Sequence, residues 1–187
     1  MKRKTQLNHN LLLAILILFS LASCTSEQQV ESHNLPISKN QHIALIGNNL
    51  CSRMLNFGHF ETELHLRYPD HELFIRNMCD GGNTPGFRPH SGRFSPWAFL
   101  GAEKFQDELA NFSHSQGHFE TPDQWLTRLE TDMIFAFFGY NESFEGTEGL
   151  PNFEGELEAF IQHTFAQEYN GKSTPQLILV SPSPFKV

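Results

Sequence analysis

The stretch Asp132-Met133-Ile134-Phe135-Ala136-Phe137-Phe138 decides the fold class, because six apolar residues follow one another there without alternating with polar ones. A short continuous run of this kind is typical of a strand that is covered on both faces, as in a parallel sheet. Three further runs share this character: His42-Ile43-Ala44-Leu45-Ile46, Leu73-Phe74-Ile75-Arg76 and Gln176-Leu177-Ile178-Leu179-Val180. The sequence therefore predicts four buried strands.

Segments with helical spacing separate these runs. Apolar residues from Leu50 to Leu64 predict a first crossover helix that is interrupted near Gly58. Thr121-Pro122 is typical of a helix start, with threonine as the N-cap and proline at the first helical position. Pro151 opens the last helix, whose apolar stripe is Phe153, Leu157, Phe160, Ile161 and Phe165. This alternation of strands and helices predicts an α/β fold with a parallel sheet.

The stretch from Pro85 to Glu120 lacks such a pattern. Gly, Pro, Ser, Asn and His residues surround a short helix that is expected near Ala102 to Phe112. A loop this long in a compact domain is usually functional or poorly ordered. We expect it to overhang the ends of the strands.

The first residues predict export. Met1-Lys2-Arg3-Lys4 and the apolar run from Leu11 to Leu21 are typical of a signal peptide, and the run is too short to span a bilayer. Leu21-Ala22-Ser23-Cys24 resembles the lipobox of bacterial lipoproteins, which implies that Cys24 is lipidated and becomes the new N-terminus. The alternative is ordinary secretion with a chance cysteine.

These features divide the chain into three parts. We expect a lipoprotein signal peptide over residues 1–23, a flexible polar tether over residues 24–40 and one domain over residues 41–187. The domain would be held by lipid on Cys24 at a bacterial membrane, on the periplasmic or cell-surface side.

Charge and motif content exclude some partners. The chain has 13 Lys+Arg and 21 Asp+Glu, and removal of residues 1–23 leaves 10 basic residues and a net charge of −11. Nucleic acid binding rests on a basic face, so no nucleic-acid partner is expected. The chain has neither a CxxCH haem site nor a paired-cysteine zinc motif, and no cofactor is expected. His114 and His118 fit a solvated surface better than a metal site.

Cys51 and Cys79 remain as an even pair in an oxidising compartment. A disulfide between them is allowed, because both follow neighbouring strands. A buried free thiol at Cys51 is the alternative. Cys51 is a poor candidate nucleophile, because two residues of helix turn its side chain by roughly 200° from that of Asn49.

Three small or amide-rich segments follow the first three predicted strands: Gly47-Asn48-Asn49-Leu50, Asn77-Met78-Cys79-Asp80-Gly81-Gly82-Asn83-Thr84 and Gly139-Tyr140-Asn141-Glu142. Ligands of an open parallel sheet bind beyond the carboxyl ends of its strands. We therefore expect these segments to converge at one edge, with His59 and His90 as candidates to line the cleft.

In this order the three segments resemble the blocks of the SGNH, or GDSL-type, hydrolase superfamily. The resemblance covers about His42 to Pro182 and puts Asn49 at the position of the nucleophilic serine. It implies an oxyanion hole formed by the Gly82 backbone N–H and the Asn141 side chain. It also implies a flavodoxin-like three-layer α/β/α fold, here with the last strand and helix missing. The family's Asp-x-x-His is absent from the sequence up to Val187.

Longer phrases resemble one branch of this superfamily: Phe57-Gly58-His59-Phe60-Glu61-Thr62, Phe138-Gly139-Tyr140-Asn141-Glu142-Ser143-Phe144 and Tyr169-Asn170-Gly171-Lys172-Ser173. That branch is the SGNH-like N-terminal domain of large exported proteins that continue into dehydrogenase-like and haem-binding regions. Without the final strand, Ile178 and Val180 are expected to lose cover, which predicts either low stability or dependence on a partner segment that completes the sheet.

Ester hydrolysis by this route needs a nucleophile, a base and oxyanion donors. Asn49 cannot act as a serine does, because a carboxamide is not deprotonated at neutral pH. Two interpretations stay open. One is a hydrolase-like lipoprotein with weak or no activity on acyl or acetyl esters, including glycan esters. The other is a non-catalytic binding or scaffold domain, in which Gly82 and Asn141 serve only a turn and a loop.

Overall fold

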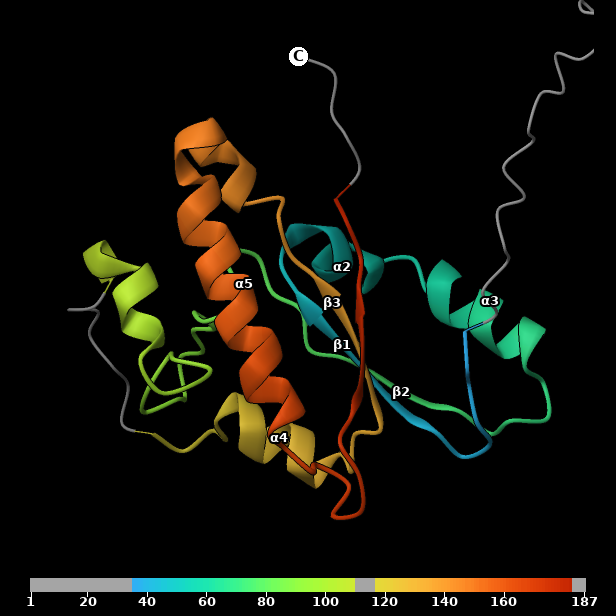
Figure 1. Ribbon diagram of the computed structural model, residues 1–187. Helices are drawn as coiled ribbons and strands as arrows, with labels where there is room; N and C mark the ends of the chain where they lie inside the picture. The colour runs from blue at the N-terminus through green and yellow to red at the C-terminus, as the bar shows by residue number, and fades with distance from the viewer. Residues whose placement is uncertain (1–34, 110–116, 183–187) are drawn as a thin grey trace, which may run out of the picture. The chain divides into compact units, whose positions relative to one another are not determined.

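The computed structural model describes residues 35–109 and 117–182, which contain a four-stranded parallel sheet (Figure 1). Its strands are β1 (His42–Gly47), β2 (Phe74–Asn77), β3 (Met133–Phe137) and β4 (Gln176–Leu179), in the order β2-β1-β3-β4. Every neighbouring pair runs parallel. The predicted α/β class and the four predicted strands are therefore confirmed. This strand order matches the first four strands of the doubly wound order 2-1-3-4-5.

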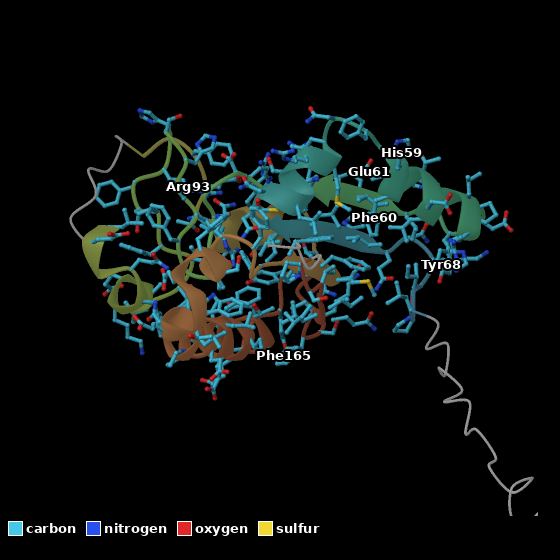
Figure 2. The ribbon with its side chains drawn as sticks, turned by 90° about the horizontal axis from the view of Figure 1, so that it is seen from above. His59, Phe60, Glu61, Tyr68, Arg93 and Phe165 are labelled. Carbon is cyan, nitrogen blue, oxygen red and sulfur yellow. A yellow bond between two sulfur atoms is a disulfide. The ribbon has the colours of Figure 1, made fainter. Side chains whose placement is uncertain are left out.

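One face of the sheet is covered by α2 (Asn49–Met54) and α3 (His59–Arg67). The two helices are separated at Gly58, whose φ of +43° is left-handed, so the predicted interruption is confirmed. Figure 2 labels Phe60 on α3. Its ring contacts those of Phe135 and Phe137 edge-on, with centroid distances of 5.6 and 6.4 Å. A disulfide joins Cys51 of α2 to Cys79, with 5.7 Å between the Cα atoms.

The opposite face is covered by α4 (Pro122–Arg128) and α5 (Leu150–Phe165). Thr121 caps α4 as predicted, because its side chain accepts the Gln124 N–H while the Gln124 side chain accepts the Thr121 N–H. The 3₁₀ segment η3 (Glu142–Gly149) leads directly into α5, which begins one residue before the predicted Pro151. The cluster on this face includes Leu126, Ile134, Phe138 and Phe160.

The segment between β2 and α4 packs into the core. It contains two 3₁₀ turns, η1 (Ala102–Phe105) and η2 (Asp107–Leu109), where one helix over Ala102 to Phe112 was expected. Residues 110–116 lie outside the described ranges. Ala98, Phe99 and Ala102 are buried together with Ala44 and Ile46 of β1. The expectation that this segment overhangs the strand ends is therefore wrong for Ala98, Phe99 and Ala102, which pack in the cluster on one face of the sheet.

A buried arginine ties this segment to α5. Arg88 is only 5% exposed, and its guanidinium lies 5.6 Å from the ring centroid of Phe138 and 5.1 Å from that of Phe160. Its Nη2 donates to the Pro85 carbonyl at 2.9 Å. Burial lowers the pKa of Arg88. Ring contacts and this backbone acceptor offset part of the cost of removing the charge from water.

A buried carboxyl group completes the junction from the side of α5. Glu156 is 1% exposed, and its Oε1 accepts the Thr84 hydroxyl at 2.6 Å and the Gly86 N–H at 3.0 Å. Burial raises the pKa of Glu156. The side chain thus holds the turn after β2 against the last helix through two hydrogen bonds.

A second polar junction links α4, α5 and the turn that follows α5. Asp123 Oδ2 lies 2.8 Å from His163 Nε2, and Asp123 Oδ1 accepts the Tyr169 hydroxyl at 2.7 Å. Burial alone would raise the pKa of Asp123, but the hydrogen bonds from His163 and Tyr169 outweigh it and lower that pKa. The carboxylate therefore joins three segments that are far apart in the sequence.

Two expectations concern the ends of the described chain: the start of the domain at Gln41, and the loss of cover at Ile178 and Val180. Ile37 is 8% exposed within the cluster under α2 and α3, so residues before the predicted start at Gln41 already pack there. At the edge strand β4, Ile178 and Val180 are partly buried, whereas Leu179 is 47% exposed. The predicted signal peptide and Cys24 lie outside the described residues. Within the described ranges, every helix falls short of the length and apolarity needed for a membrane span.

Candidate functional site

The turns after β1, β2 and β3 meet at the carboxyl edge of the sheet. Asn49 Nδ2 donates to Asn141 Oδ1 at 3.4 Å, and Asn141 Nδ2 donates to the Asn83 carbonyl at 3.3 Å. Asn49 Oδ1 lies against Gly81, where an added Cβ would come within 2.8 Å of it. We call the group Asn49, Gly81, Gly82, Asn83 and Asn141 the amide corner. The structure thus brings the predicted residues Asn49 and Asn141 into contact.

Glycine is required twice in the turn after β2. Gly81 leaves room for the Asn49 side chain, which a Cβ at this position would displace. Gly82 has a φ of +86° and is exposed, and a Cβ on it would face open space. A left-handed backbone at Gly82 lets the chain turn sharply and leaves the peptide of Gly82 on the surface of the corner.

Buried amides lie beneath the corner. Asn48 is fully buried and its Nδ2 donates to Glu142 Oε2 at 3.4 Å, while Asn83 Nδ2 donates to the Gly47 carbonyl at 3.1 Å. Glu142 Oε2 also accepts the Gly139 N–H at 2.7 Å. The turn after β3 is therefore fastened to the turn after β1 through one carboxyl group.

Glu142 is itself unusual electrostatically. Burial raises its pKa, although hydrogen bonds from its own backbone N–H, from the Gly139 N–H and from Asn48 oppose the rise. Asn48, Asn83 and Glu142 lie in the three amide-rich segments identified from the sequence, but sequence reasoning assigned none of them a role. The amide-rich composition directly after each strand was the available signal for them.

Three candidate residues from the sequence, Cys51, His59 and His90, have partners outside the amide corner. Cys51 is fully buried in the disulfide on the α2 side of the sheet, as its helical offset from Asn49 predicts. His59 stacks on Phe57 with a centroid distance of 6.2 Å, and His90 stacks on Phe119 at 3.9 Å. Both imidazoles thus have aromatic partners that do not belong to the amide corner.

In residues 35–109 and 117–182, no group of three or more His, Cys, Asp or Glu side chains is placed so that it could hold a metal ion. Of the histidine pair considered above, His114 lies outside the described residues and His118 is exposed.

The corner is built from neutral amides and peptide groups. Such groups can donate hydrogen bonds to a carbonyl oxygen or to an anion.

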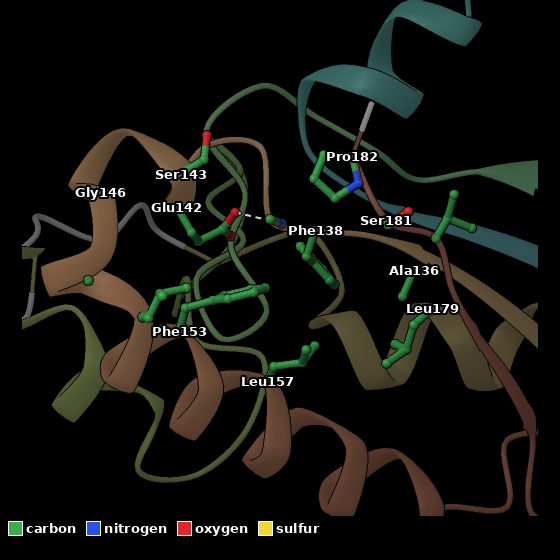
Figure 3. Close-up of a pocket in the computed structure, with 14 residues that line it drawn as sticks. Ala136, Phe138, Glu142, Ser143, Gly146, Phe153, Leu157, Leu179, Ser181 and Pro182 are labelled. Carbon is green, nitrogen blue, oxygen red and sulfur yellow. Dashed lines mark hydrogen bonds between the residues drawn. The ribbon is translucent and has the colours of Figure 1, made fainter. Parts of the chain in front are cut away.

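An apolar pocket of about 340 Å³ adjoins the corner (Figure 3). It lies between the end of the sheet and the first turns of α5. Its polar side chains are Glu142, Ser143 and Ser181, and the Ser143 hydroxyl donates to the Tyr140 carbonyl at 2.6 Å. The apolar side chains that line it are Ala136, Phe138, Leu150, Phe153, Leu157, Leu179, Val180 and Pro182.

A scan against protein-family models, a search of curated proteins and a search of solved structures each found no match for this chain. The motif resemblance to the SGNH hydrolases therefore stays a prediction.

Proposed function

We propose that this chain is an SGNH hydrolase-like lipoprotein domain that binds the carbonyl group of an acyl or acetyl ester, with weak or no hydrolysis. The observation that supports this most is the meeting of Asn49, Asn141 and the turn Gly81–Asn83. Three turns that converge beyond the carboxyl ends of parallel strands are the usual location of a ligand site in such sheets.

The donors at this site suit a carbonyl oxygen. Gly82 presents its peptide on the surface, and Asn141 carries two side-chain N–H groups, of which one donates to the Asn83 carbonyl. The second N–H of Asn141 can therefore be offered to a ligand. Because Asn49 also fixes the Oδ1 of Asn141, the amide is held in one orientation. Pre-oriented donors of this kind favour the charge that develops on an acyl oxygen.

The same residues argue against efficient turnover. Acyl transfer needs a group that attacks the carbonyl and a base that removes its proton. Asn49 stands at the expected nucleophile position and supplies neither function. Binding with little chemistry is therefore the expected behaviour, and the ligand is a small-molecule ester or an ester group on a glycan.

Hydrolysis assays on wild type and Asn141→Ala test this proposal. We expect both proteins to turn over p-nitrophenyl acetate and an acetylated sugar at the same background rate. Asn56→Ala is the matched control, because Asn56 is an exposed asparagine at the end of α2. A rate many orders of magnitude above background that Asn141→Ala abolishes and Asn56→Ala retains would identify an efficient enzyme and contradict the proposal of weak or no hydrolysis.

A further inference from the structure

A second pocket, of about 520 Å³, lies where the segment between β2 and α4 meets the start of α4. Its lining comes from the stretch 95–103 and from Thr121 and Asp123, none of which belongs to the amide corner. The volume falls within the range of small-molecule sites. This pocket therefore gives the long segment after β2 a candidate role of its own.

The apolar part of the lining includes an aromatic ring that is held in place. Trp97 is partly buried, and its ring packs against that of Phe87 with 5.4 Å between the centroids. Leu100 also lines the pocket and is fully exposed, so the pocket is open to solvent on that side. A fixed indole ring offers a ligand a large apolar contact at a low cost in side-chain entropy.

The polar part of the lining contains both donors and acceptors. Ser95 Oγ accepts the Trp97 backbone N–H at 3.3 Å, and Thr121 Oγ1 accepts a backbone N–H of α4 at 3.2 Å. Each hydroxyl can therefore donate its own proton to a ligand. Glu103 and Asp123 supply carboxylates, which accept hydrogen bonds, and the Asp123 side chain is 35% exposed.

This mixture of groups separates three classes of ligand. Two carboxylates disfavour an anion, and a cation would make no use of the hydroxyl protons. A sugar hydroxyl both donates and accepts, and the C–H face of a sugar ring is apolar. The lining thus suits a sugar better than an ion of either sign.

We propose that this pocket binds one sugar ring of a glycan. The ring lies against Trp97, and its hydroxyl groups bond to the carboxylates of Glu103 and Asp123 and to the hydroxyls of Ser95 and Thr121. The inference does not rest on the carbonyl site proposed at the amide corner.

A titration of the ¹⁵N-labelled full chain carrying Cys24→Ser, followed by NMR, tests this proposal. The chain has two tryptophans, so the Trp97 indole N–H reports on the pocket and that of Trp125 is an internal control. The probes are the methyl glycosides of glucose, galactose, mannose and N-acetylglucosamine. We expect at least one of them to shift the Trp97 signal and to leave Trp125 unchanged. No shift of Trp97 with any of the four, or equal shifts of both indoles, would overturn the inference.

Substitutions at the rim locate the ligand. Glu103→Ala should weaken glycoside binding by about three- to tenfold, the effect of losing one hydrogen bond. Glu103→Gln should restore most of the affinity, because an amide still accepts a hydrogen bond. Glu108→Ala is the matched control at an exposed position in η2 and should change nothing. Affinity that stays unchanged in both Glu103→Ala and Ser95→Ala would place the ligand elsewhere and overturn the inference.

Tetramethylammonium distinguishes a sugar from a cation, because it carries charge without hydrogen-bonding groups. We expect it to leave the Trp97 signal unchanged. A Trp97 shift with tetramethylammonium that Glu103→Gln abolishes, together with no response to the glycosides, would replace the sugar by a cation. Asn141→Ala should leave the glycoside response intact, so this pocket and the amide corner are tested separately.

Discussion

Asn49 shows how one residue type limits the chemistry of an otherwise suitable site. Its side chain contacts Asn141 and Gly81. A nucleophile would need the same position in order to face the proposed oxyanion donors. A carboxamide there contributes hydrogen bonds and fixes its neighbours, but it does not form an acyl intermediate. The residue therefore stabilises the proposed binding site at a position where a serine would begin a reaction.

The change Asn49→Ser should not create an esterase. The serine would lack a base to take its proton, because the side-chain partner at this position is the amide of Asn141, and a carboxamide does not accept a proton at neutral pH. Turnover of p-nitrophenyl acetate should stay at the level of Asn49→Ala, which controls for loss of the amide. Activity in Asn49→Ser but not in Asn49→Ala would mean that a group near residue 49 acts as the base, and would contradict this prediction.

Asp123 predicts a pH dependence of stability. The pKa of the Asp123 carboxyl group is lower in the folded chain than in the unfolded chain, where it is near 4. The ionised form therefore stabilises the fold at any pH above the unfolded-state pKa. This contribution is lost as the pH falls through the lowered pKa of the folded chain. Asp123→Asn should reduce the free energy of unfolding at pH 7 by about 1–2 kcal/mol, a range that allows for its partial exposure.

Urea unfolding at a series of pH values measures this effect. The difference between wild type and Asp123→Asn should shrink as the pH falls below about 4, because the wild-type carboxylate then becomes protonated. Asp70→Asn at an exposed position should show no comparable difference. A difference for Asp123→Asn that stays constant from pH 7 to pH 3 would contradict the assigned ionisation.

At the scale of elements, the strands and helices follow closely from the sequence. Continuous apolar runs predict the strands, because a strand covered on both faces has no polar side to display. Thr121-Pro122 predicts the start of α4, because both the hydroxyl acceptor and the fixed proline φ act locally. The junction of the 85–109 segment with α5 is not predictable in this way. Charged residues such as Arg88 and Glu156 are usually exposed, and their burial depends on partners distant in sequence.

The meeting of the three turns at the corner was predictable for a related reason. Parallel strands all end at one edge, so residues directly after them must converge. The hydrogen bonds by which Asn48, Asn83 and Glu142 hold these turns together were not predictable. Buried hydrogen bonds between turns depend on side-chain placement and not on spacing in the sequence.

The disulfide links α2 to the turn after β2. Replacing both Cys51 and Cys79 by alanine should lower the free energy of unfolding by about 2–4 kcal/mol, because the cross-link restricts the unfolded chain over a separation of 28 residues. Guanidinium unfolding of the double variant measures the loss. Wild type with its disulfide reduced should show a similar loss. Mass mapping without reductant that finds both wild-type thiols free would contradict the assignment.

The N-cap of α4 offers a smaller, local test. Thr121→Ala removes the hydroxyl that accepts the Gln124 N–H and should cost about 1 kcal/mol of stability. Thr62→Ala on exposed α3 should change stability by less than about 0.5 kcal/mol. Equal effects of the two substitutions in thermal unfolding would show that the capping box contributes nothing measurable.

The whole molecule combines a proposed lipid anchor with a domain for which we propose binding with little or no reaction. In a bacterium that processes lipoproteins, the wild-type chain should fractionate with membranes, and Cys24→Ala should not, because the acidic domain has no electrostatic attraction to anionic lipid. Intact mass of the purified chain should show acylation in wild type only. A wild-type chain in the soluble fraction without added mass would contradict the anchor.

The most direct test of the carbonyl site is a titration of ¹⁵N-labelled full chain carrying Cys24→Ser with acetamide, followed by NMR. We expect the Gly82 backbone amide and the Asn141 side-chain amide to shift together, and the Gly82 shift to be lost in Asn141→Ala but kept in Asn56→Ala. A Gly82 signal that does not move, or that moves equally in Asn141→Ala, would contradict the proposal that these two donors form one binding site.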